Sequence, residues 1–418
     1  MAEAEVPGSM PVPSETSGLL SGLRVLEIGH FVAAPFCTRL LADLGADVIK
    51  IEPPRTGDPV RQWGEQVDGN SVWWSVHGRN KRSVTLDLRS PRSREIVLGL
   101  VRQCDALVEN FRPGHLARFG LDAAALRRAR PDLIVAHISG YGQDGPYRDR
   151  AAFGVIGEAV GGLRYLSNHE PGNSDLPPVR VGLSIGDSVA GLYSAFGLMA
   201  ALWHRQWQPA GTGGCSLDVA LTESVFSLME GVLPEYGLLG KIRQPSGGRI
   251  ATAAPTNAYR TADGVWLLIA ANSDALFARL AALIGEANLP SDPRFAGNRA
   301  RVAHAAELDT IIGRWTARQT ASALEEALAN TDIPSTRVYT IADCAADPQF
   351  RARGMVREVD DPTLGQVLHP GIVPHVPEFP GTVRWPGPPV GAHTREVFRE
   401  LLGLDDDQIA DLVREGVC

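Results

Sequence analysis

The sequence predicts an α/β fold built on a Rossmann-like, doubly wound parallel sheet, and two observations lead to this prediction. From residue 23 onwards, short runs rich in Val, Ile and Leu alternate with segments whose apolar residues recur every three to four positions. This strand–helix–strand succession is typical of parallel sheets, in which a helix connects neighbouring strands. The 418 residues also give enough chain for more than one domain. Strands are expected at residues 24–28, 47–51, 83–87, 106–109, 133–138 and 216–221.

Helices are expected between these strands, and the longest of them follows Asp187. After this residue, Val189, Leu192 and Phe196 begin an apolar stripe at helical spacing that reaches about residue 205. The run of residues 177–186 before it is apolar and β-branched, so a further strand is expected there. The remaining helices are expected at residues 34–44, 91–103, 153–163 and 221–233, with another helical stretch between residues 109 and 133.

The second half of the chain predicts a smaller α+β domain between two linkers. Residues 236–255 and 341–390 are rich in Gly or Pro and are expected to be linkers, the second of them an extended arm. The small domain, residues 256–340, is predicted to hold strands at 265–270 and 333–338 and helices at 274–284 and 302–330. The other assignments are a disordered tail at residues 1–18, a large domain at 19–235, and closing helices at 391–402 and 405–415.

The composition excludes several classes of function. A net charge of −8 provides no basic field, so nucleic acid is not an expected partner. No stretch reaches the ~18 consecutive apolar residues of a membrane span, and no membrane association is expected. The five cysteines are scattered without a CxxC pair, which argues against a metal site and for a reducing, cytoplasmic location. Residues 29–35 (GHFVAAP) replace the GxGxxG motif and no P-loop occurs, which disfavours nicotinamide oxidoreductases and NTPases.

Asp187 is the main candidate for chemistry. A carboxylate in the first turn of a helix lies in the positive end of the helix dipole, which keeps it ionised. Ligands of α/β folds also bind at such strand–helix turns. Asp is a preferred N-cap as well, and spacing alone favours that structural role over a nucleophile. Cations near other strand–helix boundaries form either a grip for a phosphorylated ligand or a solvated charged face; they are Arg79, Arg82, Arg89, Arg112 and Arg118.

Several segments, in order, resemble the class III CoA-transferases, the formyl-CoA:oxalate and carnitine CoA-transferase group. The resemblance runs from about residue 19 to the C-terminus. The segments that carry it are GLRVLE (22–27), LGADVIKIE (44–52), NKRS (80–83), LVENFRPG (107–114), GYGQDGP (140–146), GD (186–187) and GAHT (391–394).

This resemblance implies that Asp187 is a nucleophile that forms an aspartyl–acyl anhydride and then an aspartyl-CoA thioester. It implies no tightly bound cofactor, because CoA and acyl-CoA are co-substrates. The positions that match CoA-contacting residues of the family are Val32, Ala33, Leu86, Arg89, Asn110, Phe111, Arg112, Arg118 and Phe153. Where the family often has Arg, this chain has Pro53, with Arg55 two residues later as a substitute.

The segment of residues 246–255 stands where formyl-CoA:oxalate transferases have a tetraglycine loop, which argues against that activity. The sequences of residues 254–259 (APTNAY) and 270–274 (AANSD) look like those of family members that use succinyl-CoA with a C4–C6 dicarboxylate such as citramalate, malate or glutarate. We expect Arg249 or His30 to pair with the distal carboxylate of such an acid. The resemblance also implies an interlocked homodimer in which the C-terminal residues 391–418 return to the large domain.

Two rival functions are less well supported by the sequence. An α-methylacyl-CoA racemase needs a His-Asp acid/base pair after the Gly-Pro-Tyr loop. This chain has Phe153 and Gly154 there, neither of which carries a proton. A non-catalytic CoA-binding protein is disfavoured by the intact Gly186–Asp187 pair and by Arg118.

Overall fold

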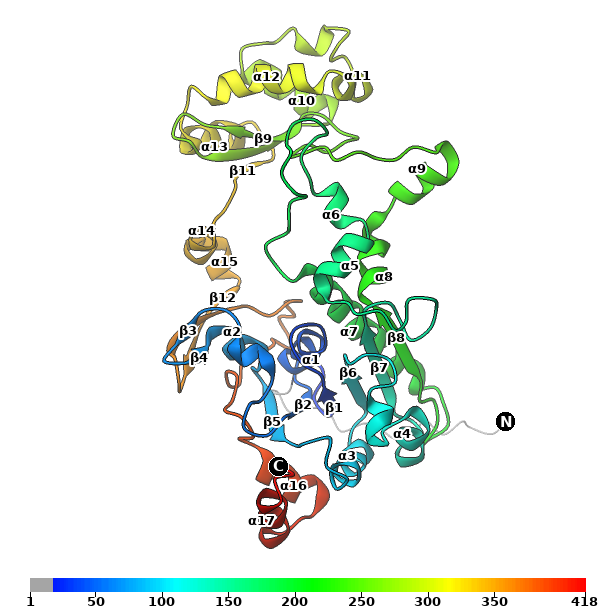
Figure 1. Cartoon of the computed structure of the whole chain (residues 1–418). Helices are drawn as coiled ribbons and strands as arrows, with labels where there is room; N and C mark the ends of the chain where they lie inside the picture. Colours follow the sequence, from blue (N-terminus) through cyan, green and yellow to red (C-terminus); the bar gives the residue numbers. More distant parts are fainter. Residues whose placement is uncertain (1–17) are drawn as a thin grey trace, which may run out of the picture. The chain divides into compact units, whose positions relative to one another are not determined.

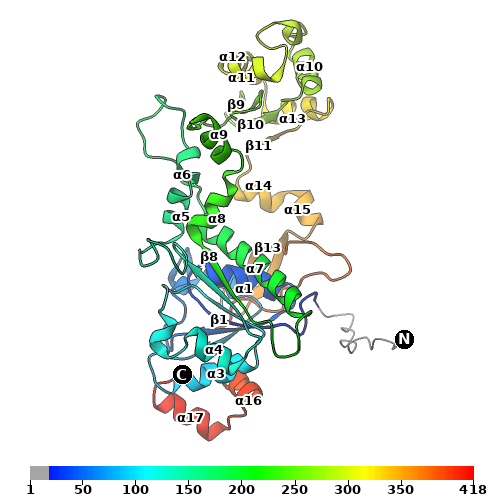
Figure 2. The same cartoon turned by 90° about the vertical axis from the view of Figure 1, so that its right-hand side faces the viewer.

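The computed structural model describes residues 18–418 (Figures 1 and 2). The predicted tail, residues 1–18, lies outside this range except for Gly18. Contacts group the chain into two compact units. Unit 1 comprises residues 18–163, Val181–Glu230 and Gln349–Cys418, and unit 2 comprises Arg164–Arg180 and Gly231–Pro348. Residues 164–180 thus group with unit 2, whereas the sequence analysis assigned them to the large domain.

Unit 1 is built on a sheet of six parallel strands in the order β5-β2-β1-β6-β7-β8 (Figure 1). Numbered along the chain, these strands run 3-2-1-4-5-6, the Rossmann order, whose switch point lies between the first and fourth strands. That point is the β1–β6 pair, in which Val25 lies beside Ala106. The strands are β1 (Arg24–Ile28), β2 (Asp47–Glu52), β5 (Lys81–Thr85), β6 (Ala106–Glu109), β7 (Ile134–Ser139) and β8 (Ser216–Ala220).

Helices cover both faces of this sheet, as a doubly wound fold requires (Figure 2). Val25 and Val48 face α1 (Ala33–Asp43) and α7 (Ile185–Arg205), whereas Leu26 and Ile49 point into a second core on the opposite face. Because successive strand residues are apolar on both faces, the strands read as continuous apolar runs. The helices of the second core are α3 (Ser93–Arg102), α4 (Ala123–Ala129), α16 (Thr394–Leu402) and α17 (Asp406–Arg414).

Shorter elements connect these parts of unit 1. They are η1 (Pro59–Gln62), β3 (Gln66–Val67), β4 (Asn70–Ser71), α2 (Val72–His77), η2 (Leu116–Phe119), α5 (Gly154–Val160), α8 (Leu221–Phe226), η3 (Ser227–Met229), β12 (Val356–Asp361) and β13 (Gly365–Pro370). Two short helices cross the division between the units, α6 (Leu163–Leu166) and α15 (Pro348–Ala352).

Unit 2 contains an antiparallel sheet in the order β11-β10-β9 with its own core. Leu267 of β10 packs there with Phe277, Leu308 and Leu324 from three helices. The buried Arg301 donates to the carbonyls of residues 254, 272 and 295 and so ties three loops together. The elements are α9 (Val232–Leu239), β9 (Thr256–Arg260), β10 (Trp266–Ala270), α10 (Asp274–Leu283), η4 (Leu289–Ser291), α11 (Asn298–Ala303), α12 (Ala305–Thr316), α13 (Ala321–Ala329), β11 (Ser335–Arg337) and α14 (Ile341–Ala346).

Several predicted elements were wrong. Residues 177–184 form no strand and are mostly exposed, because Pro177 and Pro178 carry no N–H for a sheet and the apolar pattern finds no partner strand. The predicted extended arm contains the β12–β13 hairpin, whose turn ends at Gly365 with φ of 79°. The single helix expected at residues 302–330 is divided into α11, α12 and α13, and the one expected to residue 233 ends as α8 at Phe226.

Two of the arginines at the strand boundaries fit neither of the roles considered for them, which were a grip for a phosphorylated ligand and a solvated charged face. Arg79 is buried and forms a paired contact with Asp43, with Nε–Oδ1 and Nη2–Oδ2 distances of 2.9 and 2.6 Å. Arg82 is buried as well and pairs with Asp47. Neither side chain lies on a solvated face or in a pocket, because each charge is neutralised inside the fold.

Helix α7 is long and apolar enough, by length and composition, to cross a membrane. Core helices pass the same test, and this one buries Ala190, Ser194 and Leu198 among the residues that pack on the sheet and α1. Its other face, which includes Leu192 and Phe196, is exposed.

Candidate active site

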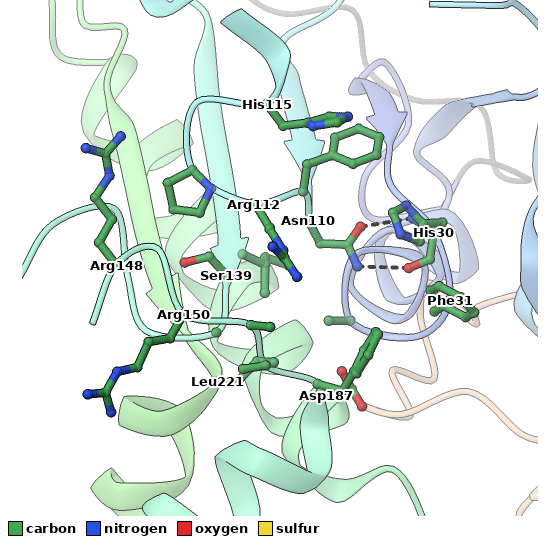
Figure 3. Close-up of a pocket in the computed structure, with 18 residues that line it drawn as sticks. His30, Phe31, Asn110, Arg112, His115, Ser139, Arg148, Arg150, Asp187 and Leu221 are labelled. Carbon is green, nitrogen blue, oxygen red and sulfur yellow. Dashed lines mark hydrogen bonds between the residues drawn. The ribbon is translucent and has the colours of Figure 1, made fainter. Parts of the chain in front are cut away.

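The switch point of the sheet opens into a pocket of about 380 Å³ within unit 1. The loop after β1 contributes His30 and Phe31, and the turn after β6 contributes Asn110 and Arg112. Asp187 closes the pocket from the first turn of α7 (Figure 3). Four of these five residues, all but Phe31, were predicted as site residues from different parts of the sequence, and they are brought together here. This is expected for an α/β fold that binds ligands at the carboxyl ends of its strands.

Asp187 is not the N-cap of α7. The helix begins at Ile185, Ser184 occupies the cap position, and Asp187 is the third helical residue and half-buried. At this position a carboxylate still lies beside the positive end of the helix dipole, which favours its ionised form. The geometry therefore leaves a carboxylate lining a pocket, and the capping role considered from the sequence does not apply.

Two glycines make room for this carboxylate. A Cβ atom on Gly154 would overlap Oδ2 of Asp187 and would lie 2.7 Å from its Cγ. A Cβ atom on Gly186 would lie 2.5 Å from the carbonyl oxygen of Gly154. The start of α5 and the start of α7 can approach this closely only because both residues lack side chains.

The β1–α1 loop is held from three directions. The side-chain amide of Asn110 accepts from the His30 N–H at 2.9 Å and donates to the His30 carbonyl at 2.8 Å (Figure 3). Phe31, in a left-handed conformation with φ of 62°, donates its N–H to Asp58 at 3.0 Å. Lys50 donates to the Gly29 carbonyl at 2.8 Å. This loop is therefore rigidly positioned, although nothing in the sequence identified Lys50 or Asp58.

Lys50 belongs to a fully buried cluster of charges beneath the loop. Its ammonium lies 2.6 Å from Glu27 and 2.7 Å from Asp58, and Lys81 lies 2.9 Å from Glu27. Burial by itself raises the pKa of Glu27, but the charges of Lys50 and Lys81 outweigh it and lower that pKa to about 2. Glu27 is thus ionised and paired with both lysines, which suits a structural role.

His30 lies where burial lowers its pKa below the ordinary value of 6.5, although Asp58 partly opposes the shift. The imidazole is therefore mainly neutral at pH 7 and offers a hydrogen bond rather than a positive charge. Its ring packs 4.9 Å from Phe31 and 5.1 Å from Phe111, centroid to centroid. Phe153 adds an exposed ring 6.3 Å from Phe31, so one wall of the pocket is aromatic.

Three arginines also line the pocket, and two of them were missed in the sequence. Arg148 and Arg150 follow the GYGQDGP segment, which carries part of the family resemblance, but neither arginine was predicted to meet a ligand. Figure 3 shows Arg112 within the ring of lining residues and Arg148 and Arg150 at its edge. Because Asp187 is the one carboxylate among the lining residues, the pocket is electropositive and suited to anionic ligands.

A second pocket of about 630 Å³ adjoins the first, since His30, Phe31, Phe111 and His115 line both. Its other side is formed by three residues that were predicted to meet CoA, namely Leu86, Arg89 and Arg55. Leu86 is buried, whereas Arg89 is exposed and pairs with Asp87 at 2.9 Å. Together the two pockets form one elongated site along the edge of the sheet.

The remaining predicted residues lie apart from these pockets. Val32 is buried at the start of α1, next to Ala33, which does line the first pocket. Arg118 is exposed on η2 and lines neither pocket. Arg249 belongs to unit 2, where it pairs with Asp309 at 2.5 Å and with Glu170 beside a separate pocket of about 410 Å³.

Among residues 18–418, no group of three or more His, Cys, Asp and Glu side chains is arranged to hold a metal ion. An ionised carboxylate facing an electropositive, partly aromatic cavity is suited to attack on an activated acyl group.

Known proteins share this arrangement of sequence and fold. A family model described as "CoA-transferase family III" matches residues 20–394. Succinyl-CoA–D-citramalate CoA-transferase of Chloroflexus aurantiacus is 46% identical over 95% of this chain and 98% of its own. Succinate–glutarate CoA-transferase of Agrobacterium fabrum is 33% identical over 91% of this chain and 95% of its own.

A solved structure shows the same architecture. The crystal structure of a CAIB/BAIF family protein from Brucella suis matches with a TM-score of 0.80 and 33% identity, over 92% of this chain and 100% of that one. The resemblance seen in the sequence is thereby confirmed at the level of the family, as is the expectation of an enzyme. The chain belongs to CoA-transferase family III and is a CoA-transferase.

Proposed function

We propose that this enzyme moves CoA from succinyl-CoA to a C4–C6 dicarboxylic acid, with Asp187 as the nucleophile. The observation that carries the proposal is the position of Asp187, which lines an electropositive pocket at the switch point of the sheet. The choice of substrates is supported by relatives named for succinyl-CoA with D-citramalate and for succinate with glutarate. Acceptors of this class are citramalate, malate and glutarate.

In the proposed reaction, the Asp187 carboxylate attacks the thioester carbonyl and releases CoA thiolate, forming an aspartyl–acyl anhydride. The thiolate then attacks the aspartyl carbonyl, which releases the donor acid and leaves an aspartyl-CoA thioester. The acceptor carboxylate attacks this thioester to form a second anhydride, and the returning thiolate takes the acceptor acyl group. Asp187 ends the cycle as a free carboxylate, so a difficult exchange becomes several easier steps.

We assign CoA to the elongated site formed by the two adjoining pockets. Leu86 and Phe111 supply apolar contacts, and Arg55, Arg89 and Arg112 supply positive charge for its phosphates. The backbone at Val32 and Ala33 begins α1 without a side-chain cap, so its N–H groups remain available to an anionic oxygen. Arg118, exposed nearby in sequence, is proposed to meet a phosphate outside the pockets.

For the distal carboxylate of the acid, His30 is the candidate within the Asp187 pocket, and it acts as a neutral hydrogen-bond donor. Arg249 remains the alternative, proposed from the sequence alone. If Arg249→Ala leaves the KM of the dicarboxylate unchanged while His30→Ala raises it, the role belongs to His30.

An isomerase of the racemase type is not supported. Proton exchange at the α-carbon needs acid/base groups on both faces of the substrate. The start of α5 offers only Phe153 and Gly154. The space in which a side chain at residue 154 would lie is occupied by the Asp187 carboxylate, so no second acid stands there.

We also propose a homodimer, interlocked as the family resemblance implies, and a cytoplasmic location. The exposed face of α7 carries Leu192, Phe196 and Trp203, of which 57%, 71% and 61% is accessible in the single chain. An apolar stripe of this size is typical of a protein interface. The five cysteines are free thiols, consistent with a reducing compartment.

The test is a comparison of turnover by wild type, Asp187→Ala and Asp407→Ala, with succinyl-CoA and each dicarboxylate. Asp407 is an exposed carboxylate in the first turn of α17 and serves as a matched control. We expect ping-pong initial-rate patterns for wild type and Asp407→Ala and no turnover for Asp187→Ala. Sequential patterns, or turnover by Asp187→Ala near that of wild type, would refute the proposal.

A further inference from the structure

The Asn110 side chain binds the backbone of the loop that faces it, using both ends of its amide. Its oxygen accepts from the His30 N–H at 2.9 Å, and its nitrogen donates to the His30 carbonyl at 2.8 Å (Figure 3). The side chain thus pairs with one residue of the β1–α1 loop as a neighbouring strand would. It continues the β1–β6 ladder beyond its last pair, Ile28 with Glu109.

Asn110 is itself held in place by the residue before it. One oxygen of the Glu109 carboxylate accepts from the Phe111 N–H at 2.7 Å, and the other lies 2.5 Å from Nδ1 of His137 on β7. Glu109 is buried, and its two bonds tie the turn that carries Asn110 to β7. The position of Asn110 is therefore supported by contacts with the neighbouring strand.

The space around the pair is tightly filled. A Cβ atom on Gly29 would lie 2.8 Å from the Asn110 oxygen and 2.5 Å from the Cβ of Ala34. On the far side of the loop, Asp58 accepts from the Phe31 N–H and Lys50 donates to the Gly29 carbonyl. Four hydrogen bonds therefore hold residues 29–31 in this arrangement, and Asn110 supplies two of them.

From this geometry we propose that Asn110 is a positioning residue, which acts on the reaction through the His30 loop and not by direct contact with CoA. Both polar atoms of its amide are already paired with the loop. The loop in turn places the His30 and Phe31 side chains and the start of α1 around the pocket of Asp187. The inference rests on the proposed function only in taking that pocket as the site of acyl transfer, and it revises the CoA contact that the family resemblance implied for this side chain.

The first test separates binding from turnover. Asn110→Asp keeps the size of the side chain and the bond from the His30 N–H, but it cannot donate to the His30 carbonyl. We expect kcat to fall by about 10-fold to 100-fold, because displacement of a supporting group by a fraction of an ångström is costly in catalysis. The Kd of CoA, measured by calorimetry, is expected to change less than about threefold. Asn330→Asp, at an exposed asparagine of unit 2, is the matched control for a new charge.

The second test is a double-mutant cycle with His30→Ala. If Asn110 acts through the loop, its substitution is expected to have a smaller effect in the His30→Ala background than in wild type, by at least about threefold. A direct contact with CoA predicts the opposite: a Kd for CoA weakened about tenfold or more, unchanged kcat, and effects that multiply in the cycle. Any one of these three results would overturn the proposal.

One further variant keeps the test decisive. Asn110→Ser, which is smaller and neutral, replaces the aspartate variant if that variant does not fold, with the same expected outcomes. The Kd of CoA does not depend on the identity of the nucleophile. If Asp187→Ala retains turnover, the proposed function therefore fails, while the assignment of Asn110 is still judged by its own binding and cycle data.

Discussion

Gly154 faces the Asp187 carboxylate so closely that no side chain fits between them. A Cβ atom on Gly154 would overlap Oδ2 and lie 3.2 Å from the backbone nitrogen of Asp187. Since Asp187 is fixed by the first turn of α7, any side chain at residue 154 must displace the carboxylate rather than the helix. This pair explains why the position that could have carried a second acid is a glycine in this chain.

We predict that Gly154→Ala lowers kcat by at least about tenfold, because the methyl group rotates the carboxylate away from the pocket and overpacking of this kind costs roughly 1–3 kcal/mol. Gly182→Ala is the control, since a Cβ atom there meets nothing within 4 Å. Steady-state kinetics with succinyl-CoA and a dicarboxylate provide the measurement. Equal rates for Gly154→Ala and wild type would show that the close approach has no bearing on catalysis.

The buried charge cluster predicts a large effect on stability. In Lys50→Met, the carboxylates of Glu27 and Asp58 lose a partner in a site without water, which typically costs about 3–5 kcal/mol. Urea unfolding followed by circular dichroism is expected to show a correspondingly lower midpoint. Lys241→Met, at an exposed lysine, is expected to leave the midpoint unchanged. A midpoint for Lys50→Met equal to that of wild type would contradict the role given to the cluster.

His369 predicts how stability depends on pH. It is buried on β13, with Nε2 2.9 Å from the Ser75 hydroxyl, which donates to Asp361 at 2.6 Å. Burial, assisted by the charge of Arg79, lowers the pKa of His369 to about 4. Between pH 6.5 and 4 the unfolded chain therefore takes up a proton that the folded chain refuses, so the free energy of unfolding falls as the pH falls.

We expect His369→Gln to reduce this loss of stability between pH 6.5 and 4 by about 2–3 kcal/mol, since each pKa unit is worth about 1.4 kcal/mol. Urea titrations at several pH values measure the slope. His375→Gln, at an exposed histidine, should keep the slope of wild type. A slope that is identical for His369→Gln and wild type would exclude His369 as its source.

The exposed face of α7 predicts a change of oligomeric state. Phe196→Glu places a charge in the centre of the apolar stripe and is expected to shift the proposed homodimer to monomers, as measured by light scattering after gel filtration. Val413→Glu on α17, where an exposed valine is likewise replaced, controls for the added charge. A Phe196→Glu protein with the dimer mass of wild type would place the interface elsewhere.

The sequence predicted the parallel sheet well because apolar runs of β-branched residues are a local signal. β1 and β6 agree with the structure residue for residue, and the end of α7 at Arg205 agrees as well. β5 begins at Lys81, two residues before its predicted start, because the charges of Lys81 and Arg82 are neutralised by partners far away in the sequence. No local pattern reveals such partners.

For the candidate site, too, the sequence predicted some features and not those that depend on distant partners. Asp187, His30 and Arg112 were identified from their positions at strand–helix boundaries and Phe111 from the family resemblance. The strand order of the sheet brings all four to one pocket. The double contact of Asn110 with His30 depends on the register of β1 with β6, which the sequence does not specify. Single-residue assignments such as that of Arg249, which pairs with Asp309 in unit 2, depend on tertiary contacts in the same way.

The most direct test of the account is the intact mass of the protein after brief exposure to succinyl-CoA without an acceptor. Wild type, Asp187→Ala and Asp407→Ala are compared, and any adduct is located by peptide mapping. We predict an acyl or CoA adduct on Asp187 in wild type and in Asp407→Ala, and none in Asp187→Ala. An adduct on another residue, or wild-type turnover with no adduct on Asp187, would contradict covalent catalysis by Asp187.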